Sequence, residues 1–203
     1  MSKAKQAIYN KARQDKFLLS LNLPPALRKI DSKLPTKNSD VSLDSLQFAV
    51  YGVVVPTISV PEEETAYAGQ TSKFSSHHRP SYENVAVKFK IDNNYWNYWV
   101  LWSWLNLFND ADTGMFDPDE LISHEPSKNP VDTKVVNSLG VHRQYTTDIS
   151  LFGIDEYNKK TIEFKYVGAF PVQLEEINFD YQAEMEIESG FTFTFSRLIA
   201  TLV

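Results

Sequence analysis

The chain has 203 residues, 42% hydrophobic and 13% aromatic, so it can bury the core of one large domain or of one domain with an extension. Its net charge of −6 argues against a nucleic-acid-binding module as a whole. The lack of cysteine excludes a disulfide scaffold, a thiolate metal site and a cysteine nucleophile, and it fits a reducing compartment.

Charge divides the chain into a basic arm and an acidic body. Residues 1–40 hold nine Lys and Arg against three Asp and Glu, a net of +6, whereas the rest of the chain nets −12. We predict an N-terminal extension with a short helix over 1–45 and a β-rich domain over 46–203. The arm is either a solvated tail or a segment that docks on the acidic body of a neighbouring copy. The candidate contacts for such docking are Lys11, Arg13, Lys16, Arg28 and Lys29.

Within the arm, residues 3 to about 20 predict a helix, because Ile8, Ala12 and Leu19 recur toward one face. The apolar run at 17–23 follows five Lys and Arg residues and precedes two prolines without a small-residue cleavage site, which argues against a secretory signal. The prolines end the helix, and residues 31–45 predict a linker. No membrane anchor is expected, and we expect a soluble protein.

The body begins with a β-branched and aromatic stretch over 46–61, in which Gly52 and Pro56 are expected bend or bulge points. Residues 62–82 are polar and predict a loop or a mobile hairpin. The segment NVAVKFKI, 84–91, alternates cleanly, which is typical of a strand with one buried face; that face carries Val85, Val87, Phe89 and Ile91.

A helix is predicted over about 93–108, with Asp92 as its N-cap. All four tryptophans of the protein lie in it: Trp96, Trp99, Trp102 and Trp104. The segment is apolar nearly all round, so a single packed face cannot bury it. Either the body wraps the helix from two sides or a second chain covers part of it. The apolar stretch at 95–108 is interrupted by polar residues and is shorter than the roughly 20 residues needed to span a bilayer.

The C-terminal half predicts a long, mostly irregular segment over 109–143 and strands over 144–154 and 160–170. A turn is expected at Tyr157-Asn158, and Pro171 is expected to stop the second strand. After a short connection, the stretch EMEIESGFTFTF at 184–195 alternates strictly and predicts the last long strand. One face carries core phenylalanines; the other carries Glu184, Glu186, Glu188, Gly190, Thr192 and Thr194.

None of the motifs supports catalysis, a metal or a cofactor. The acidic stretch 109–121 fails the EF-hand pattern, because Gly114 and Leu121 fall at the wrong loop positions. The four histidines are scattered, which makes a zinc site a poor interpretation. The three glutamates at 184–188 offer nothing that would separate their pKa values for acid and base roles. No phosphate-binding loop, dinucleotide fingerprint or nucleophile elbow is present, so we expect no enzyme.

Two stretches resemble the tail tube proteins of contractile-tailed bacteriophages. In the stretch 84–106, an alternating strand leads to an Asp, an Asn-Tyr pair and a Trp-containing helix, with matches at Val87, Phe89, Asp92, Asn97, Tyr98 and Trp104. In the stretch 164–195, an aromatic strand ends in a Gly-Ala-Phe-Pro corner at 168–171 before a final long strand. The arm and the segment at 109–143 look like additions to the shorter family members.

The resemblance implies a mainly β fold, a β-sandwich or small barrel with one flanking helix. It implies a structural virion protein whose hexameric rings stack into a hollow tail tube for DNA. The implied partners are other copies of the chain, the tail sheath, the tape-measure and baseplate proteins, and DNA that passes without specific binding. The implied place is the virion tail, assembled in the host cytoplasm.

On that basis we expect the even face of 184–194 to line the lumen or an inter-ring surface. Candidate lumen residues are Glu184, Glu186, Glu188, Thr192 and Thr194, since acidic residues repel a phosphate backbone. Candidate inter-subunit residues include Trp96, Trp99 and Trp102, and the segment 62–82 is expected to add to the sheet of the next ring. The alternatives are a tube-initiator or cap protein, a type VI secretion tube, and a carbohydrate-active enzyme or lectin.

Overall fold

The computed structural model describes residues 11–27, 49–115, 138–181 and 185–203. In chain order, the strands and helices are β1 (Phe17–Leu21), β2 (Ala49–Val53), β3 (Glu62–Tyr67), β4 (Gln70–Ser75), β5 (Val85–Lys90), α1 (Trp96–Asn106), α3 (Ser138–Tyr145), β6 (Thr147–Ile154), β7 (Lys160–Leu174), β8 (Glu188–Thr194) and β9 (Arg197–Leu202). Among the described helices, none is long and apolar enough to cross a membrane.

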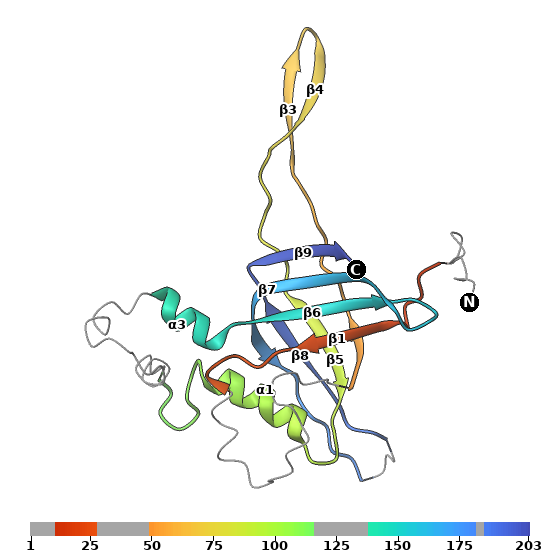
Figure 1. Ribbon diagram of the computed structural model, residues 1–203. Coiled ribbons are helices and arrows are strands. Elements are labelled where there is room, and N and C mark those ends of the chain that lie inside the picture. Colours follow the sequence, from red (N-terminus) through yellow and green to blue (C-terminus); the bar gives the residue numbers. More distant parts are fainter. Residues whose placement is uncertain (1–10, 28–48, 116–137, 182–184) are drawn as a thin grey trace, which may run out of the picture.

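One antiparallel sheet of seven strands forms the body. Its order is β1-β6-β7-β8-β5-β2, and β9 also pairs with β7. The long strand β7 belongs to both halves of the sheet: its first part pairs with β6 and β9, and its end pairs with β8. The two halves cross at a steep angle, so the sheet folds over itself as a small sandwich (Figure 1). The predicted mainly β fold with a flanking Trp-rich helix is confirmed.

The corner of the sheet lies at Gly168, whose φ of 66° is in the left-handed region. A Cβ at this position would lie 3.3 Å from Ser196 Oγ, a tight contact that the Ser196 side chain would have to shift to accommodate. The Ser196 N–H donates to the Val167 carbonyl (N to O distance 3.0 Å). As a result β8 and β9 follow β7 around the corner in one continuous register, with Thr194 opposite Phe170 and Arg197 opposite Val167.

The core fills the space between the two halves of the sheet. Its side chains come from alternate positions on β1, β5, β6, β7 and β8, as the pleat of a strand requires. The fully or almost fully buried members include Leu21, Val85, Val87, Phe89, Ile149, Tyr166, Phe191 and Phe193. The alternation predicted for 84–91 and for the phenylalanine face of the last strand is therefore confirmed.

Helix α1 closes one end of this core. Trp104 is fully buried, and its indole N–H donates to the Tyr145 carbonyl (Nε1 to O distance 2.7 Å). The helix begins at Trp96, later than predicted, and Tyr95 in left-handed conformation occupies the cap position. Asp92 is thus not the N-cap, although its carboxylate accepts the Trp96 N–H at 2.8 Å. The Asn97 side chain ties the helix back to the Lys90 carbonyl at the end of β5.

The helix predicted for 3 to about 20 is wrong where the structure describes it. Phe17–Leu21 form β1, which pairs with β6 at the edge of the sheet, and Leu19, Leu21 and Leu23 lie in the core. These leucines follow the period of a strand, and pairing with β6 satisfies the backbone that a helix would otherwise satisfy. The division of the chain at residue 45 therefore does not coincide with the sheet, which takes an edge strand from the first segment.

Three other boundaries differ from prediction. Pro171 does not stop β7: the strand continues to Leu174, because the proline lies next to a bulge, where a missing N–H is tolerated. Helix α3 occupies the end of the segment predicted to be irregular, and β6 consequently starts later, at Thr147. The last predicted strand is shorter, beginning at Glu188, and a further strand, β9, follows it. The predicted bulge near Gly52 and the turn at Asn158 are present.

The hydroxyl of Tyr166 is buried in the core without a hydrogen-bond partner among the described residues. Its ring packs edge-on against Phe193 and Phe195. Burial raises the pKa of Tyr166 to about 12, from an ordinary value of 10.0, because the tyrosinate would lose its hydration.

We expect Tyr166→Phe to raise the free energy of unfolding by about 1 kcal/mol at pH 7, since it removes an unsatisfied buried hydroxyl. Below pH 10, the unfolded pKa, Tyr166 is neutral in both states and its ionisation does not affect stability. As pH rises from there toward the folded value of about 12, only the unfolded state ionises, and the free energy of unfolding falls by roughly 1.4 kcal/mol per pH unit. Urea unfolding at pH 7 and pH 11 measures both effects. The variant should lack this alkaline loss; an equal loss in both proteins would contradict the assignment.

Candidate functional site

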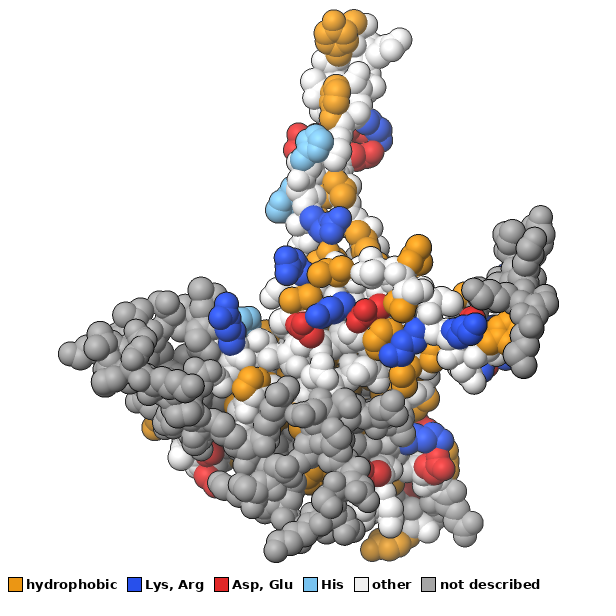
Figure 2. Space-filling view, viewed as in Figure 1, with side chains coloured by type: hydrophobic (Ala, Val, Ile, Leu, Met, Phe, Trp, Pro, Cys, Tyr) orange, Lys and Arg blue, Asp and Glu red, His pale blue; other side chains and the backbone are white. Residues whose placement is uncertain are grey.

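Three features of the described surface are the candidates for a functional site. Among the described residues, no group of three His, Asp or Glu side chains is placed to hold a metal ion. The three surfaces are a projecting hairpin (Figures 1 and 2), an exposed part of helix α1, and the outward face of β8 with its neighbours.

The β3–β4 hairpin projects far from the body on two long connecting arms (Figure 1). Ala68 and Gly69 both have positive φ, 52° and 78°, as a two-residue hairpin turn requires. Every residue of β3 is exposed, and so is nearly all of β4. A two-stranded ribbon alone is marginally stable in water, and no other described strand pairs with this one.

The two faces of the hairpin differ. Opposed residues of an antiparallel pair share a face, and the register puts Phe74 opposite Glu63 and Tyr67 opposite Gln70. These residues, with Thr65 and Ser72 between them, form the hairpin aromatic face, where Tyr67 and Phe74 are 75% and 58% exposed. On the other face Lys73 bridges two carboxylates, those of Glu62 (2.7 Å) and Glu64 (3.1 Å).

Helix α1 keeps a second apolar surface in solvent. Trp99 and Trp102 are 37% and 44% exposed, Tyr95 lies on the same side one turn earlier, and Trp96 stacks on Trp99 with ring centroids 5.5 Å apart. The exposed ring of Phe179, from the β7–β8 connection, contacts Tyr95. We call Tyr95, Trp99, Trp102 and Phe179 the helix patch; it lies at the end of the molecule opposite the hairpin (Figure 1).

Charged side chains on and beside the outward face of β8 have polar partners. Lys88 pairs with Glu175, Lys90 pairs with Glu186, and the Tyr51 hydroxyl donates to Glu188 at 2.9 Å. The carboxylates raise the pKa of both lysines, through hydrogen bonds first. Gly190 leaves room for this layer, because a Cβ there would lie 2.7 Å from the Glu175 carboxyl group.

Four of the predicted lumen residues are described: Glu186, Glu188, Thr192 and Thr194. The last three lie at alternate positions of β8 and share its outward face. Glu184 lies outside the described residues. The sequence showed Glu186 and Glu188 but not their partners, which come from β5 (Lys90) and β2 (Tyr51). Alternation in NVAVKFKI puts Lys88 and Lys90 on the outward face, and that was the available signal for the pairing.

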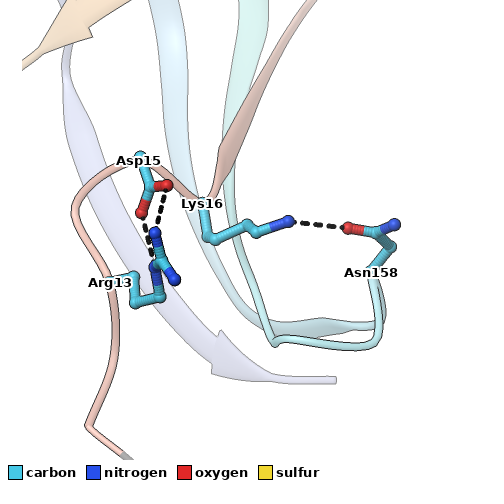
Figure 3. A network of polar contacts seen from close by, with 4 residues as sticks. All are labelled: Arg13, Asp15, Lys16 and Asn158. Atoms are coloured by element: carbon cyan, nitrogen blue, oxygen red, sulfur yellow. Dashed lines mark hydrogen bonds and ion pairs between the residues drawn. The ribbon is translucent and has the colours of Figure 1, made fainter.

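The predicted basic contacts of the arm are partly engaged within the molecule (Figure 3). Arg13 makes a bidentate pair with Asp15 (2.9 and 2.8 Å), and Lys16 donates to the Asn158 side chain at 3.2 Å. Both lie in exposed positions, where such pairs contribute little to stability. Lys11 is exposed, and Arg28 and Lys29 lie outside the described residues.

The fold resembles that of several solved assemblies. A chain of an extracellular contractile injection system, the PVC sheath-tube complex in its extended state, is 14% identical with a TM-score of 0.54, over 100% of this chain and 99% of that one. A chain of the anti-feeding prophage tube terminating cap is 13% identical with a TM-score of 0.54, over 98% and 97%. At these identities the likeness concerns the fold alone.

No curated protein sequence matches the chain. The family model described as phage tail tube protein, however, matches residues 12–201, which is nearly the whole chain. The matched range includes β1, both halves of the sheet, the projecting hairpin and helix α1. The chain therefore belongs to the phage tail tube protein family.

Proposed function

We propose that this chain is a structural subunit without catalytic activity, that six copies close a ring, and that the rings stack into a hollow tube through which DNA passes. The observation that carries the proposal is the family match over 12–201. The exposed hairpin and the exposed aromatic side chains of α1 agree with it. The family is a structural one, and a tube needs contacts in two directions: sideways within a ring and end to end between rings.

Open strand edges support the sideways contacts. Within the described residues β1, β2 and β9 each pair on one side only, so their other edges present free backbone groups. Closure of a ring by pairing such edges between copies would satisfy those groups. The projecting hairpin supports the contacts between rings, in line with its predicted addition to a neighbouring sheet.

The outward face of β8 is our proposed channel wall, but its physical basis differs from a bare row of carboxylates. Because Lys88 and Lys90 pair with Glu175 and Glu186, the wall exposes few free cations to hold DNA by counterion release. Paired charges also occur on the outside of the other half of the sheet, where Lys165 pairs with Asp148. Charge pairing alone therefore does not select one face as the wall.

Selective labelling tests the wall, since a single introduced cysteine has no competitor in a chain without cysteine. We expect Glu186→Cys in assembled tubes to react with a small maleimide but not with one carrying a bulky polyethylene glycol. The unassembled variant should react with both reagents. Equal reaction of the bulky reagent before and after assembly would place this face outside the channel.

The sheath, baseplate and tape-measure proteins are the further partners we propose, and the particle tail is the proposed location, with assembly in the host cytoplasm. Self-association is the first test. Sedimentation velocity of the purified protein should show a species of six subunits that grows into larger polymers as concentration rises. A single monomer peak at all concentrations and salt conditions would contradict the proposal.

A second candidate is a tube-end protein of the same fold, an initiator or cap present in one ring. The terminating cap chain and the sheath-tube chain have equal TM-scores against this protein, so likeness of fold supports both candidates. The two candidates differ in polymerisation: a tube subunit grows past a single ring, whereas a tube-end protein stops there.

A further inference from the structure

The hairpin aromatic face needs an occupant that the body does not provide. Tyr67 and Phe74 share one face of an isolated ribbon, whereas the charged groups of the opposite face are already paired through Lys73. A ribbon that had only to remain soluble would have no need to gather its two large apolar side chains on one side. Glu63, at the base of the hairpin, is the one charged residue of this face.

The helix patch is the matching surface in kind. It is aromatic, and α1 contributes no charged residue to it. Docking of the hairpin aromatic face on this patch would therefore cover no lysine or arginine, and Glu63 at the base of the hairpin is the one charged group of that face whose hydration it would affect. Aromatic side chains are also the residues that contribute most to association at protein interfaces.

We propose that the hairpin aromatic face of one copy docks on the helix patch of the next copy along the tube. The hairpin and helix α1, which carries most of the patch, lie at opposite ends of the same molecule (Figure 1), and apolar side chains are visible along the projecting hairpin (Figure 2). A contact between opposite ends is heterologous, and it repeats without closing when successive copies are stacked. The inference rests on the proposed function and adds to it the pair of surfaces that joins adjacent rings.

A cross-link between two differently labelled chains tests the contact directly. Thr65→Cys lies on the hairpin aromatic face and leaves Tyr67 and Phe74 in place, while Trp102→Cys leaves the rest of the helix patch. The two variants are mixed, assembled and treated with a short bis-maleimide. Thr71→Cys, on the ion-paired face of the same hairpin and equally exposed, replaces Thr65→Cys as the matched control.

We expect a heterodimeric cross-link for Thr65→Cys with Trp102→Cys, and a yield several-fold lower for Thr71→Cys with Trp102→Cys. Normal tubes that give equal yields, or no Thr65–Trp102 product, would overturn this inference while leaving the proposed function intact. Failure of the unsubstituted protein to form any ring or tube would instead contradict the proposed function, and the inference with it.

A second measurement keeps the inference testable if a cysteine variant assembles poorly. Tyr67→Ser combined with Phe74→Ser should raise the concentration needed for polymerisation by roughly tenfold or more, as for loss of interface anchors. Thr65→Ser combined with Thr71→Ser is the control and should leave that concentration unchanged. An unchanged polymerisation concentration in the aromatic double variant would refute the docking of this face.

Discussion

Trp104→Ala should lower the free energy of unfolding by about 4 kcal/mol, a large share of the stability of an ordinary domain. The indole is fully buried, and its N–H donates to the Tyr145 carbonyl, so the truncation leaves a cavity and removes the donor of that hydrogen bond. Chemical denaturation followed by circular dichroism measures the loss.

The matched control is Trp102→Ala, two residues earlier on the same helix. Trp102 is 44% exposed, so its truncation should reduce the free energy of unfolding of the monomer by about 1 kcal/mol or less. Equal losses for the two variants would contradict the division of α1 into a core side and an assembly side.

Replacement of the β3–β4 hairpin, residues 62–75, by a short Gly–Ser turn should abolish the growth of tubes and leave the fold of the body intact. The hairpin residues are exposed and absent from the core, so their removal takes no packing away from the sheet. Thermal unfolding should give a melting temperature within a few degrees of that of the full chain, and light scattering should show no polymers.

The control for this prediction keeps the whole hairpin and replaces only Ala66, on its ion-paired face, by serine. It should polymerise normally. Polymers of normal length from the chain without the hairpin would show that ring stacking uses other surfaces, and a large drop in melting temperature would show that the hairpin belongs to the folded body.

Sequence reasoning identified the strands whose burial is one-sided. Val85, Val87 and Phe89 recur at every second position because one face of β5 meets the core and the other faces outward, and the local pattern is sufficient to show it. The same holds for Phe191 and Phe193 on β8. The helix predicted over about 93–108 is present as α1, although its expected N-cap, Asp92, is not the cap residue.

Long-range pairing decided what the pattern alone did not. Leu19 and Leu21 belong to a strand because β6 supplies partners more than a hundred residues away. Strand β7 passes through Pro171 because the bend of the sheet places that proline beside a bulge. The lysine partners of the β8 carboxylates come from β5, and only the strand register brings Lys90 next to Glu186.

The surfaces of the hairpin were the least accessible to sequence reasoning. Residues 62–82 read as a polar loop or a mobile hairpin, and the sharing of one face by Tyr67 and Phe74 depends on the register set by the Ala68-Gly69 turn. Once the register is known, the two-sided character of the hairpin follows from the sequence.

Electron microscopy of the purified full-length protein tests the central claim most directly. The account predicts six-fold rings with an open centre, stacked into tubes with one hairpin from each subunit reaching into the adjacent ring. Images that contain only isolated, unringed particles at high protein concentration, together with a native particle that holds the chain as a single copy, would contradict it.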